Sequence, residues 1–160
     1  MENIIIKKAN INNSDLITKY LKKMLLDMNE YGGYTVSSSE KAWIDIEEKI
    51  KCNFSNKDYI YLLAEDNSTS KVIGYSEAKI LESNPIFEKT KQLHISAVFV
   101  EKDYRKKGIG KIIINELIKI AKDNNCQEID LNVLLNNDAY FLYKSLGFED
   151  FRVNMIKKII

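Results

Sequence analysis

A short basic segment of the chain combines the end of an apolar run with two closely spaced glycines. Over residues 98–111 it reads Val-Phe-Val-Glu-Lys-Asp-Tyr-Arg-Lys-Lys-Gly-Ile-Gly-Lys. At the start of a helix the first backbone N–H groups have no partner inside the helix, and the helix dipole adds partial positive charge. Glycine lets a phosphate approach the backbone closely. Four side chains of this segment are cationic: Arg105, Lys106, Lys107 and Lys111. The segment therefore predicts an anion site at the start of a helix.

Two better-known glycine motifs do not fit this segment. A P-loop needs a glycine five residues before Gly110, where Arg105 stands, and a Ser or Thr where Ile112 stands. A dinucleotide-binding turn needs a small residue three positions after Gly110, where the chain has Ile113. The alternative without a ligand is a solvated basic turn that caps a helix, and a lone Gly-x-Gly favours that alternative.

Hydrophobic periodicity predicts the elements that must position this segment. Strands are predicted over 3–9, 59–65, 72–81, 92–100, 128–135 and 151–159. Helices are predicted over 14–30, 38–51, 108–124 and 137–146. This order, β-α-α-β-β-β-α-β-α-β, is typical of an α/β (α+β) fold with a mixed sheet and helices on its faces. With 160 residues and no Pro/Gly/Ser-rich linker, the sequence predicts one domain over 1–160.

Composition excludes several classes of protein. Twenty-four basic and 23 acidic residues give a net charge of +1, which argues against a generally basic nucleic-acid binder. Two distant cysteines, Cys52 and Cys126, and one histidine fit neither a zinc site nor a disulfide framework, so a cytoplasmic protein is expected. No apolar run approaches the ~20 residues of a membrane span. The many Ile, Lys and Asn residues are typical of an AT-rich, bacterial genome.

Two motifs resemble those of the GNAT superfamily of N-acetyltransferases. The turn after residue 104 is similar to that family's (R/Q)-x-x-G-x-(G/A) loop. Over 136–148 the chain reads Asn-Asn-Asp-Ala-Tyr-Phe-Leu-Tyr-Lys-Ser-Leu-Gly-Phe, similar to the family pattern N-x-x-A-x-x-L-Y-x-x-x-G-F. The resemblance covers 93–148. It implies a mostly antiparallel sheet of six to seven strands with about four helices, and acetyl-CoA as the cosubstrate.

The resemblance also assigns residues to the coenzyme. In such enzymes the fourth strand carries a bulge and splays from the fifth, and a main-chain N–H near Val98 or Phe99 would polarise the thioester carbonyl. Arg105 would position the loop or contact phosphate. Asn136 would bind the pantetheine arm or, alternatively, cap a helix. The full set is Val98, Phe99, Val100, Arg105, Lys106, Lys107, Gly108, Ile109, Gly110, Lys111, Asn136, Ala139 and Tyr143.

Catalytic roles follow from the same resemblance. Tyr143 matches the family's tyrosine that protonates the departing CoA thiolate, and the alternative is a core tyrosine. Many members place a basic glutamate on the fourth strand, where this chain has His94, its only histidine. An ordinary histidine can accept a proton near neutral pH, and the alternative is a histidine at the sheet surface. Glu77 on the neighbouring strand is a second candidate for the base.

Acceptor specificity in the superfamily resides mainly in the first two helices and the loop between them. Here that region holds Tyr31 and Tyr34, and aromatic rings beside an acidic residue can hold an ammonium group. With Glu77 they form the predicted acceptor site, and the alternative is an ordinary helix–helix loop. The favoured acceptor is a small-molecule amine, followed by a protein or peptide amine. A CoA-binding sensor without catalysis is the alternative function, and a homodimer is expected by analogy with similar enzymes.

Overall fold

The computed structural model describes residues 3–32, 36–82, 84, 86, 91–157 and 159. Five strands form one sheet in the order β1-β2-β3-β4-β5. Their bounds are Ile4–Lys8 (β1), Tyr59–Asp66 (β2), Lys71–Glu82 (β3), Lys91–Val100 (β4) and Glu128–Leu131 (β5). Neighbouring strands are antiparallel except β4 and β5, which run parallel. The predicted mixed, mostly antiparallel α/β fold is confirmed.

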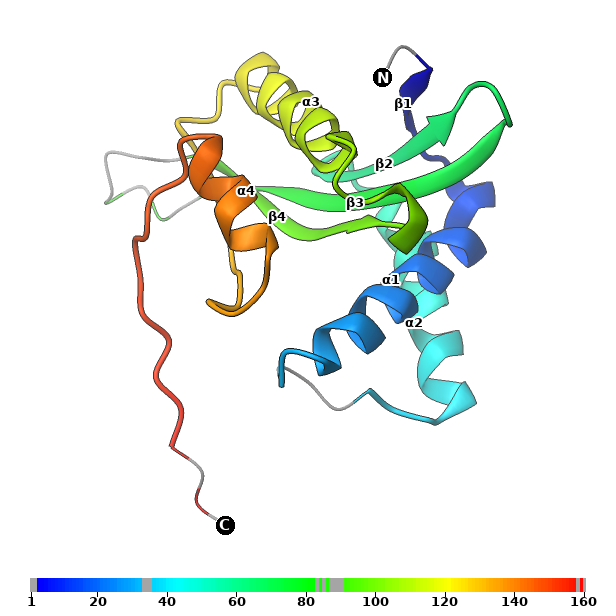
Figure 1. The fold of residues 1–160 in the computed structure, drawn as a ribbon, viewed down its shortest axis with the longest axis horizontal. Coiled ribbons are helices and arrows are strands. Elements are labelled where there is room, and N and C mark those ends of the chain that lie inside the picture. The colour runs from blue at the N-terminus through cyan, green and yellow to red at the C-terminus, as the bar shows by residue number, and fades with distance from the viewer. Residues whose placement is uncertain are drawn as a thin grey trace.

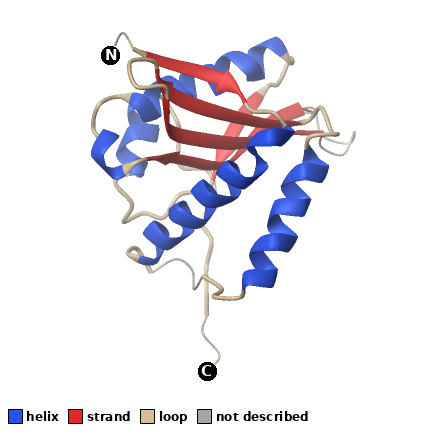
Figure 2. Ribbon diagram, turned by 90° about the vertical axis from the view of Figure 1, so that its right-hand side faces the viewer, coloured by secondary structure: helices blue, strands red, loops and turns tan. Residues whose placement is uncertain are grey.

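Helices cover both faces of the sheet (Figures 1 and 2). Their bounds are Ser14–Asn29 (α1), Glu40–Asn53 (α2), Ile109–Asp123 (α3) and Ala139–Ser145 (α4). α1 and α2 lie against one face, while α3 and α4 lie on the other side (Figure 1). A short 3-10 helix, Lys102–Tyr104, separates β4 from the basic loop that leads into α3. The sheet thus presents the end of β4 to helices on both faces.

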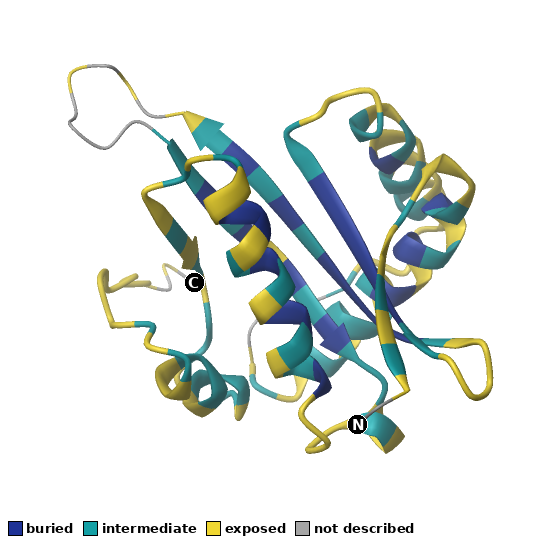
Figure 3. Cartoon of the chain, turned by 90° about the horizontal axis from the view of Figure 1, so that it is seen from above, coloured by how far each residue is buried: buried dark blue, intermediate teal, exposed yellow. Residues whose placement is uncertain are grey.

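Each face of the sheet carries its own apolar cluster. On the α3 side, Ile113, Ile114 and Leu117 are fully buried, and Figure 3 shows the buried stripe of α3 running over the strands. The helical spacing of these apolar residues explains why the stripe faces the sheet. On the opposite side, Ile17 of α1 and Tyr75 of β3 belong to a second buried cluster. Together the two clusters bury both faces of the interior strands β2, β3 and β4.

β4 changes its surroundings partway along its length. Its register with β3 shifts between Ile95 and Ala97, so that Ser96 bulges out and is exposed. Ile95 packs in the α3-side cluster and Ala97 in the α1-side cluster, a change of face that one extra residue produces. The bulge predicted near Val98 and Phe99 is therefore misplaced, since both pair regularly with β3.

The pairing of β4 with β5 stops beside this bulge. It extends only from Gln92 opposite Glu128 to Ile95 opposite Leu131. Over 96–100 the outer edge of β4 has no strand partner in the described chain. An unpaired edge presents main-chain donors and acceptors to whatever lies beside it. The structure thus has an open sheet edge that ends at the basic loop.

The prediction of a sixth strand over 151–159 is wrong for the residues that the structure describes. Residues 151–157 and 159 belong to no strand, and their side chains are exposed. In Figure 1 this part of the chain runs away from the body. Alternating apolar residues such as Phe151, Val153 and Met155 gave the prediction, but alternation marks a strand only where one face is covered. The sheet therefore has five strands in the described chain instead of six to seven.

Gly74 of β3 marks a close approach between strands, and replacing it should destabilise the fold. A Cβ at this position would lie 2.7 Å from the carbonyl oxygen of Phe99, which is backbone and cannot swing aside. We expect Gly74→Ala to lower the free energy of unfolding by about 2–3 kcal/mol, as overpacking does. Gly32→Ala is the matched control, because no atom lies within 4 Å and only its φ of +72° opposes the change. Urea denaturation that ranks Gly32→Ala as the more damaging variant would contradict this expectation.

Candidate active site

The loop before α3 leaves a row of backbone N–H groups without a partner in the described chain. Lys106 and Gly108 have positive φ values of 59° and 77°, while α3 begins at Ile109. Residues 106–111 donate no backbone hydrogen bond to any described residue, and the first helical bond is that of Ile112 to the Gly108 carbonyl. Successive free amides in such alternating conformations form an anion-binding concavity. The N-terminus of α3 adds its dipole. The geometry therefore fits a phosphate group.

Cations stand around these amides. Lys106 and Lys111 are exposed and make no ion pair with any described residue, so both ammonium groups are available to an anion. Lys107 donates to the Asp103 carbonyl at 2.8 Å and therefore also fixes the loop. A Cβ on Gly110 would lie 3.1 Å from Cδ2 of Leu142, so this glycine lets α3 approach α4. Of the predicted phosphate ligands, Lys106 and Lys111 are the best placed.

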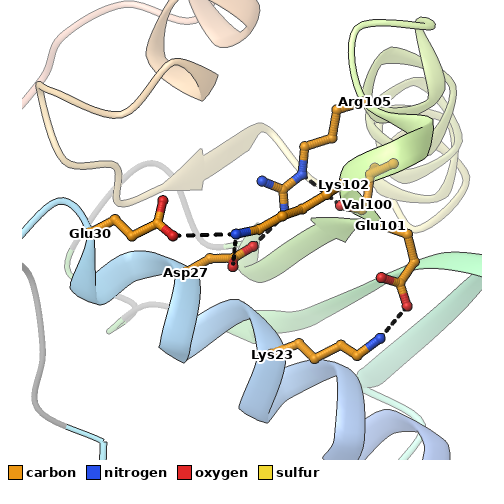
Figure 4. Close-up of polar contacts among 7 residues, drawn as sticks. All are labelled: Lys23, Asp27, Glu30, Val100, Glu101, Lys102 and Arg105. Carbon is orange, nitrogen blue, oxygen red and sulfur yellow. Dashed lines mark hydrogen bonds and ion pairs between the residues drawn. The ribbon is translucent and has the colours of Figure 1, made fainter.

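Arg105 has a different role from these lysines. Its guanidinium pairs with Asp27 of α1, and its Nε donates to the Val100 carbonyl at 2.8 Å (Figure 4). Its Cζ also lies 5.5 Å from the centre of the Phe99 ring. Of the two predicted roles for Arg105, these contacts favour the positioning of the loop. The ion pair joins the loop to α1.

A network of charges extends this connection. Lys102 lies 3.3 Å from carboxylate oxygens of both Asp27 and Glu30, and Lys23 lies 2.5 Å from Glu101 (Figure 4). Burial opposes ionisation of Asp27, but the hydrogen bonds from Arg105 and Lys102 outweigh it and lower the pKa of this carboxyl. Asp27 therefore stays ionised at neutral pH.

A cavity of about 290 Å³ borders the same network. It is lined by residues of α1, the end of β4 and the following turn: Lys23, Leu26, Asp27, Phe99, Glu101, Lys102 and Asp103. Tyr143 does not contribute to this lining. The cavity therefore lies on the α1 side of β4, whereas Tyr143 packs against the cluster on the α3 side.

The predicted strand residues lie next to the loop. Phe99 is buried, and its ring centre lies 5.5 Å from that of Tyr20 of α1 in a tilted arrangement. Val98 and Val100 are half-buried and pack on the α3 side. Their contribution to a ligand would come from the backbone, along the outer edge of β4 that no described strand covers. An extended ligand chain can pair with such an edge as an added strand does.

The start of α4 differs in detail from the expectation. Asn136 does not cap the helix, because the side chain of Asn137 accepts the Ala139 N–H at 2.9 Å. Asn136 Nδ2 instead donates to the Tyr31 carbonyl at 3.2 Å. This bond joins the end of α1 to the start of α4, so Asn136 lies at the boundary of both predicted sites. Ala139 is the first residue of α4.

Tyr143 presents a phenol that has no hydrogen-bond partner among the described residues. Its ring meets Phe148 edge-on at 5.7 Å and packs against the α3-side cluster. Within the described chain its hydroxyl makes no hydrogen bond. Burial raises the pKa of Tyr143 to about 12, so the phenol stays protonated at neutral pH. A protonated, unpaired hydroxyl is the state that a general acid needs.

His94 lies on the other face of β4, beside an aspartate that sequence reasoning missed. Its Nδ1 is 3.1 Å from Oδ1 of Asp130, which stands directly opposite on β5. Glu77, the second candidate for the base, lies on the same face and is half-buried. Burial raises the pKa of Glu77, and the nearby Lys49 partly opposes this shift. Asp130 could have been found only from the pairing of β4 with β5.

The predicted acceptor residues are partly placed. Tyr31 follows α1 and is half-buried, while Tyr34 lies outside the described residues. Trp43 of α2 lies under the ammonium of Lys22, at 5.1 Å from the ring centre. The structure therefore does not bring the aromatic residues of this region into one described pocket.

Other kinds of site are not found in the described part of the chain. No group of three or more His, Cys, Asp or Glu residues there could hold a metal ion. Burial raises the pKa of the Cys126 thiol, which leaves it a poor nucleophile at neutral pH. Among the described helices, none has the length and apolar character to cross a membrane.

Comparison with known proteins agrees with this architecture. Over 63 residues the chain is 36% identical to thialysine N-epsilon-acetyltransferase of Bos taurus, a match that covers 39% of this chain and 37% of that protein. The chain thus matches less than half the length of this relative. Two solved structures share the fold. One is a predicted acetyltransferase from Clostridium acetobutylicum with acetyl-CoA (TM-score 0.79, 18% identity, covering 98% of this chain and 96% of that one).

The other is AAC(6')-Iy in complex with the bisubstrate analogue CoA-S-monomethyl-acetylneamine. Its TM-score is 0.74 at 17% identity, over 98% of this chain and 99% of that one. The model of the Acetyltransferase (GNAT) family matches residues 23–148, from the middle of α1 to the end of the α4 region. This span contains the basic loop, the open edge of β4, His94 and Tyr143. The chain belongs to the GNAT acetyltransferase family.

Proposed function

We propose that this protein is an N-acetyltransferase that moves an acetyl group from acetyl-CoA to the primary amine of a small molecule. The observation that carries the proposal is the row of free backbone amides over 106–111, which lies at the end of the open edge of β4. A diphosphate joined to an extended arm needs both features side by side. Membership of the GNAT family supports the same chemistry.

The chain's own residues fit the coenzyme. The amides of 106–111 with Lys106 and Lys111 would hold the diphosphate, and Arg105 would hold the loop in place through Asp27. The pantetheine arm would pair with the backbone edge of β4 over 96–100. Bound acetyl-CoA supplies an activated thioester carbonyl. A main-chain N–H on that edge would then donate to the carbonyl oxygen as charge develops there.

Two side chains would move the protons of the transfer. The nitrogen–carbon bond forms while the carbon–sulfur bond breaks, so one proton must leave the amine and one must reach the sulfur. His94 would take the proton from the amine, and Tyr143 would give its phenolic proton to the sulfur. His94 faces the α1 side of the sheet and Tyr143 packs on the α3 side, so the amine and the coenzyme would reach the same carbonyl carbon from opposite sides of the sheet. The reaction is direct, without an acyl-enzyme, because the Cys126 thiol is protonated and outside the loop.

The choice of a small amine as acceptor rests on two acidic side chains near His94. Asp130 and Glu77 stand on the sheet face that carries His94. Carboxylates near a histidine favour a cationic substrate by charge complementarity. One relative is named for thialysine, and one structural neighbour holds the bisubstrate analogue CoA-S-monomethyl-acetylneamine; both descriptions support a small amine as the acceptor.

A screen of amines tests the activity directly. Purified protein is incubated with acetyl-CoA and aminoglycosides, polyamines, amino acids, thialysine or peptide N-termini, and the release of free thiol is measured. We expect acetyl transfer to at least one small amine, with peptides as poorer acceptors. Binding of CoA without thiol release on any amine would instead show a sensor and overturn the proposal.

The lysines of the loop give a quantitative test of coenzyme binding. We expect Lys106→Gln and Lys111→Gln each to raise the KM for acetyl-CoA about tenfold, since each loses a charge-assisted contact of about 1.5 kcal/mol. Lys119→Gln on the same helix is the matched control, because Lys119 is exposed far from the loop. The kcat should change little in all three variants. Equal KM values for Lys106→Gln, Lys111→Gln and Lys119→Gln would contradict the phosphate role of the loop.

A further inference from the structure

Asp130 lies directly beside His94, on the same face of the sheet. Both residues point away from the α3-side cluster, because their sequence neighbours Leu93, Ile95 and Leu131 pack into it. β4 and β5 pair in parallel with His94 directly opposite Asp130. The register therefore holds the two side chains together without any loop between them.

The hydrogen bond defines which nitrogen of the ring carries a proton. Nδ1 of His94 lies 3.1 Å from Oδ1 of Asp130. An ionised carboxylate can only accept a hydrogen bond, so Nδ1 must be the donor. In a neutral imidazole the other nitrogen, Nε2, is then left as the acceptor.

The setting of the pair argues against a purely structural role. The side chains of His94 and Asp130 are 26% and 50% exposed, and an ion pair with this exposure adds little to stability. Lys79 stands opposite His94 on β3, but its ammonium lies over the Tyr59 ring at 4.6 Å. Asp130 is thus the charged group that the structure hydrogen-bonds to the imidazole.

We propose that Asp130 is a positioning residue that holds His94 in the Nδ1–H tautomer and so aims Nε2 at the acceptor amine. This inference rests on the proposed function, in which His94 takes the proton of the amine. The proton passes from the amine nitrogen to Nε2, and the imidazolium that results remains paired with the Asp130 carboxylate. No other co-reactant is needed for this step.

The single histidine of the chain makes the tautomer directly observable. Protein labelled with ¹⁵N-histidine gives one pair of ring-nitrogen signals, which belong to His94. In the neutral imidazole, observed at about pH 8.5, we expect a protonated Nδ1 and an unprotonated Nε2 in the wild type. Asp130→Ala should shift the proton to Nε2 or to a mixture of both nitrogens. Asp130→Glu should restore the Nδ1–H form at least in part.

Kinetics with the best amine of the screen form the second arm. We expect Asp130→Ala to lower kcat about tenfold, a part of the 10²–10⁴ that general bases contribute, with the KM for acetyl-CoA unchanged. Asp123→Ala is the matched control, because it removes the same charge from the exposed end of α3 and should change neither readout.

The two arms separate the failure of this inference from that of the proposed function. A wild-type Nε2–H tautomer, or a kcat and tautomer that Asp130→Ala leaves unchanged, overturns the positioning role while acetyl transfer itself stands. A wild-type protein that transfers acetyl to no amine overturns the proposed function, and the catalytic role of the pair with it, whichever tautomer is observed.

Discussion

Replacing Tyr143 with phenylalanine is expected to lower kcat about a hundredfold, the lower end of the range for the loss of a general acid. The hydroxyl donates to no described residue, so its removal breaks no internal hydrogen bond. Phenylalanine keeps the ring that packs against Phe148 and the α3-side cluster. The KM for acetyl-CoA should therefore stay within about twofold, because the variant removes an interaction made only in the transition state.

The measurement is a comparison of steady-state kinetics for Tyr143→Phe and a control tyrosine variant. Tyr104→Phe is a suitable control, because Tyr104 precedes the basic loop and packs against the α3-side cluster. It removes the same hydroxyl group as Tyr143→Phe, but at a position outside the proposed catalytic pair. An acyl donor whose leaving thiol has a low pKa offers a second readout. Such a thiolate leaves without being protonated, so Tyr143→Phe and Tyr104→Phe should react with this donor at equal rates. A kcat of Tyr143→Phe equal to that of Tyr104→Phe would contradict the acid role.

The sequence was sufficient for elements whose apolar residues follow one period. The helical spacing of Ile113, Leu117 and Ile120 predicted α3 within a residue at each end, and the same residues are buried. The end of β5 was harder to predict. Apolar and polar residues continue to alternate over 132–135, but the pairing of β4 with β5 ends at Leu131, so these residues form no strand. Alternation reports which residues a strand would bury, whereas pairing decides whether the strand forms.

The site was predictable where its function depends on the backbone and less so where it depends on partners. Glycine and lysine at adjacent positions identified the loop over 106–111, because local sequence sets its conformation. The partner of Arg105, in contrast, is Asp27, 78 residues earlier in the chain. The bond from Asn136 to Tyr31 spans 105 residues. Such contacts depend on how helices pack on the sheet, which periodicity alone does not define.

Two of these long-range contacts involve the C-terminal end of α1. α1 carries Asp27 and ends next to Tyr31, so it contacts both the basic loop before α3 and the start of α4. Its ion pairs with Arg105 and Lys102 are at the protein surface and are weakened by salt.

Buried tyrosines are expected to make the fold unstable in alkali. Burial raises the pKa of Tyr75 well above 10 and that of Tyr143 to about 12, with the Glu77 charge adding to the shift of Tyr75. Phenols of the unfolded chain ionise near pH 10. Between about pH 10 and 12 the unfolded state has therefore lost protons that the folded state still holds, and the free energy of unfolding falls as the pH rises.

The size of this effect is comparable to the whole stability of a domain. A protected phenol costs about 1.4 kcal/mol per pH unit in that window, so Tyr143 alone costs about 3 kcal/mol by pH 12, and Tyr75 adds to this loss. Domains are stable by about 5–15 kcal/mol. Burial also raises the pKa of Tyr20 and of Tyr61 to about 12, which adds to the loss. We expect cooperative unfolding between about pH 10.5 and 12, observed by circular dichroism.

Tyr75→Phe isolates the contribution of one phenol. The Tyr75 hydroxyl is fully buried and has no hydrogen-bond partner in the part of the chain that the structure describes. Its removal therefore relieves an unpaired polar group and should not destabilise the protein at pH 7. Below pH 10 the phenol is neutral in both states, and the variant should match or exceed the wild type in urea. Above pH 10 it no longer favours the unfolded chain, so the unfolding midpoint should rise by several tenths of a pH unit. A midpoint for Tyr75→Phe at or below that of the wild type would show that other groups, such as lysines, control alkaline unfolding.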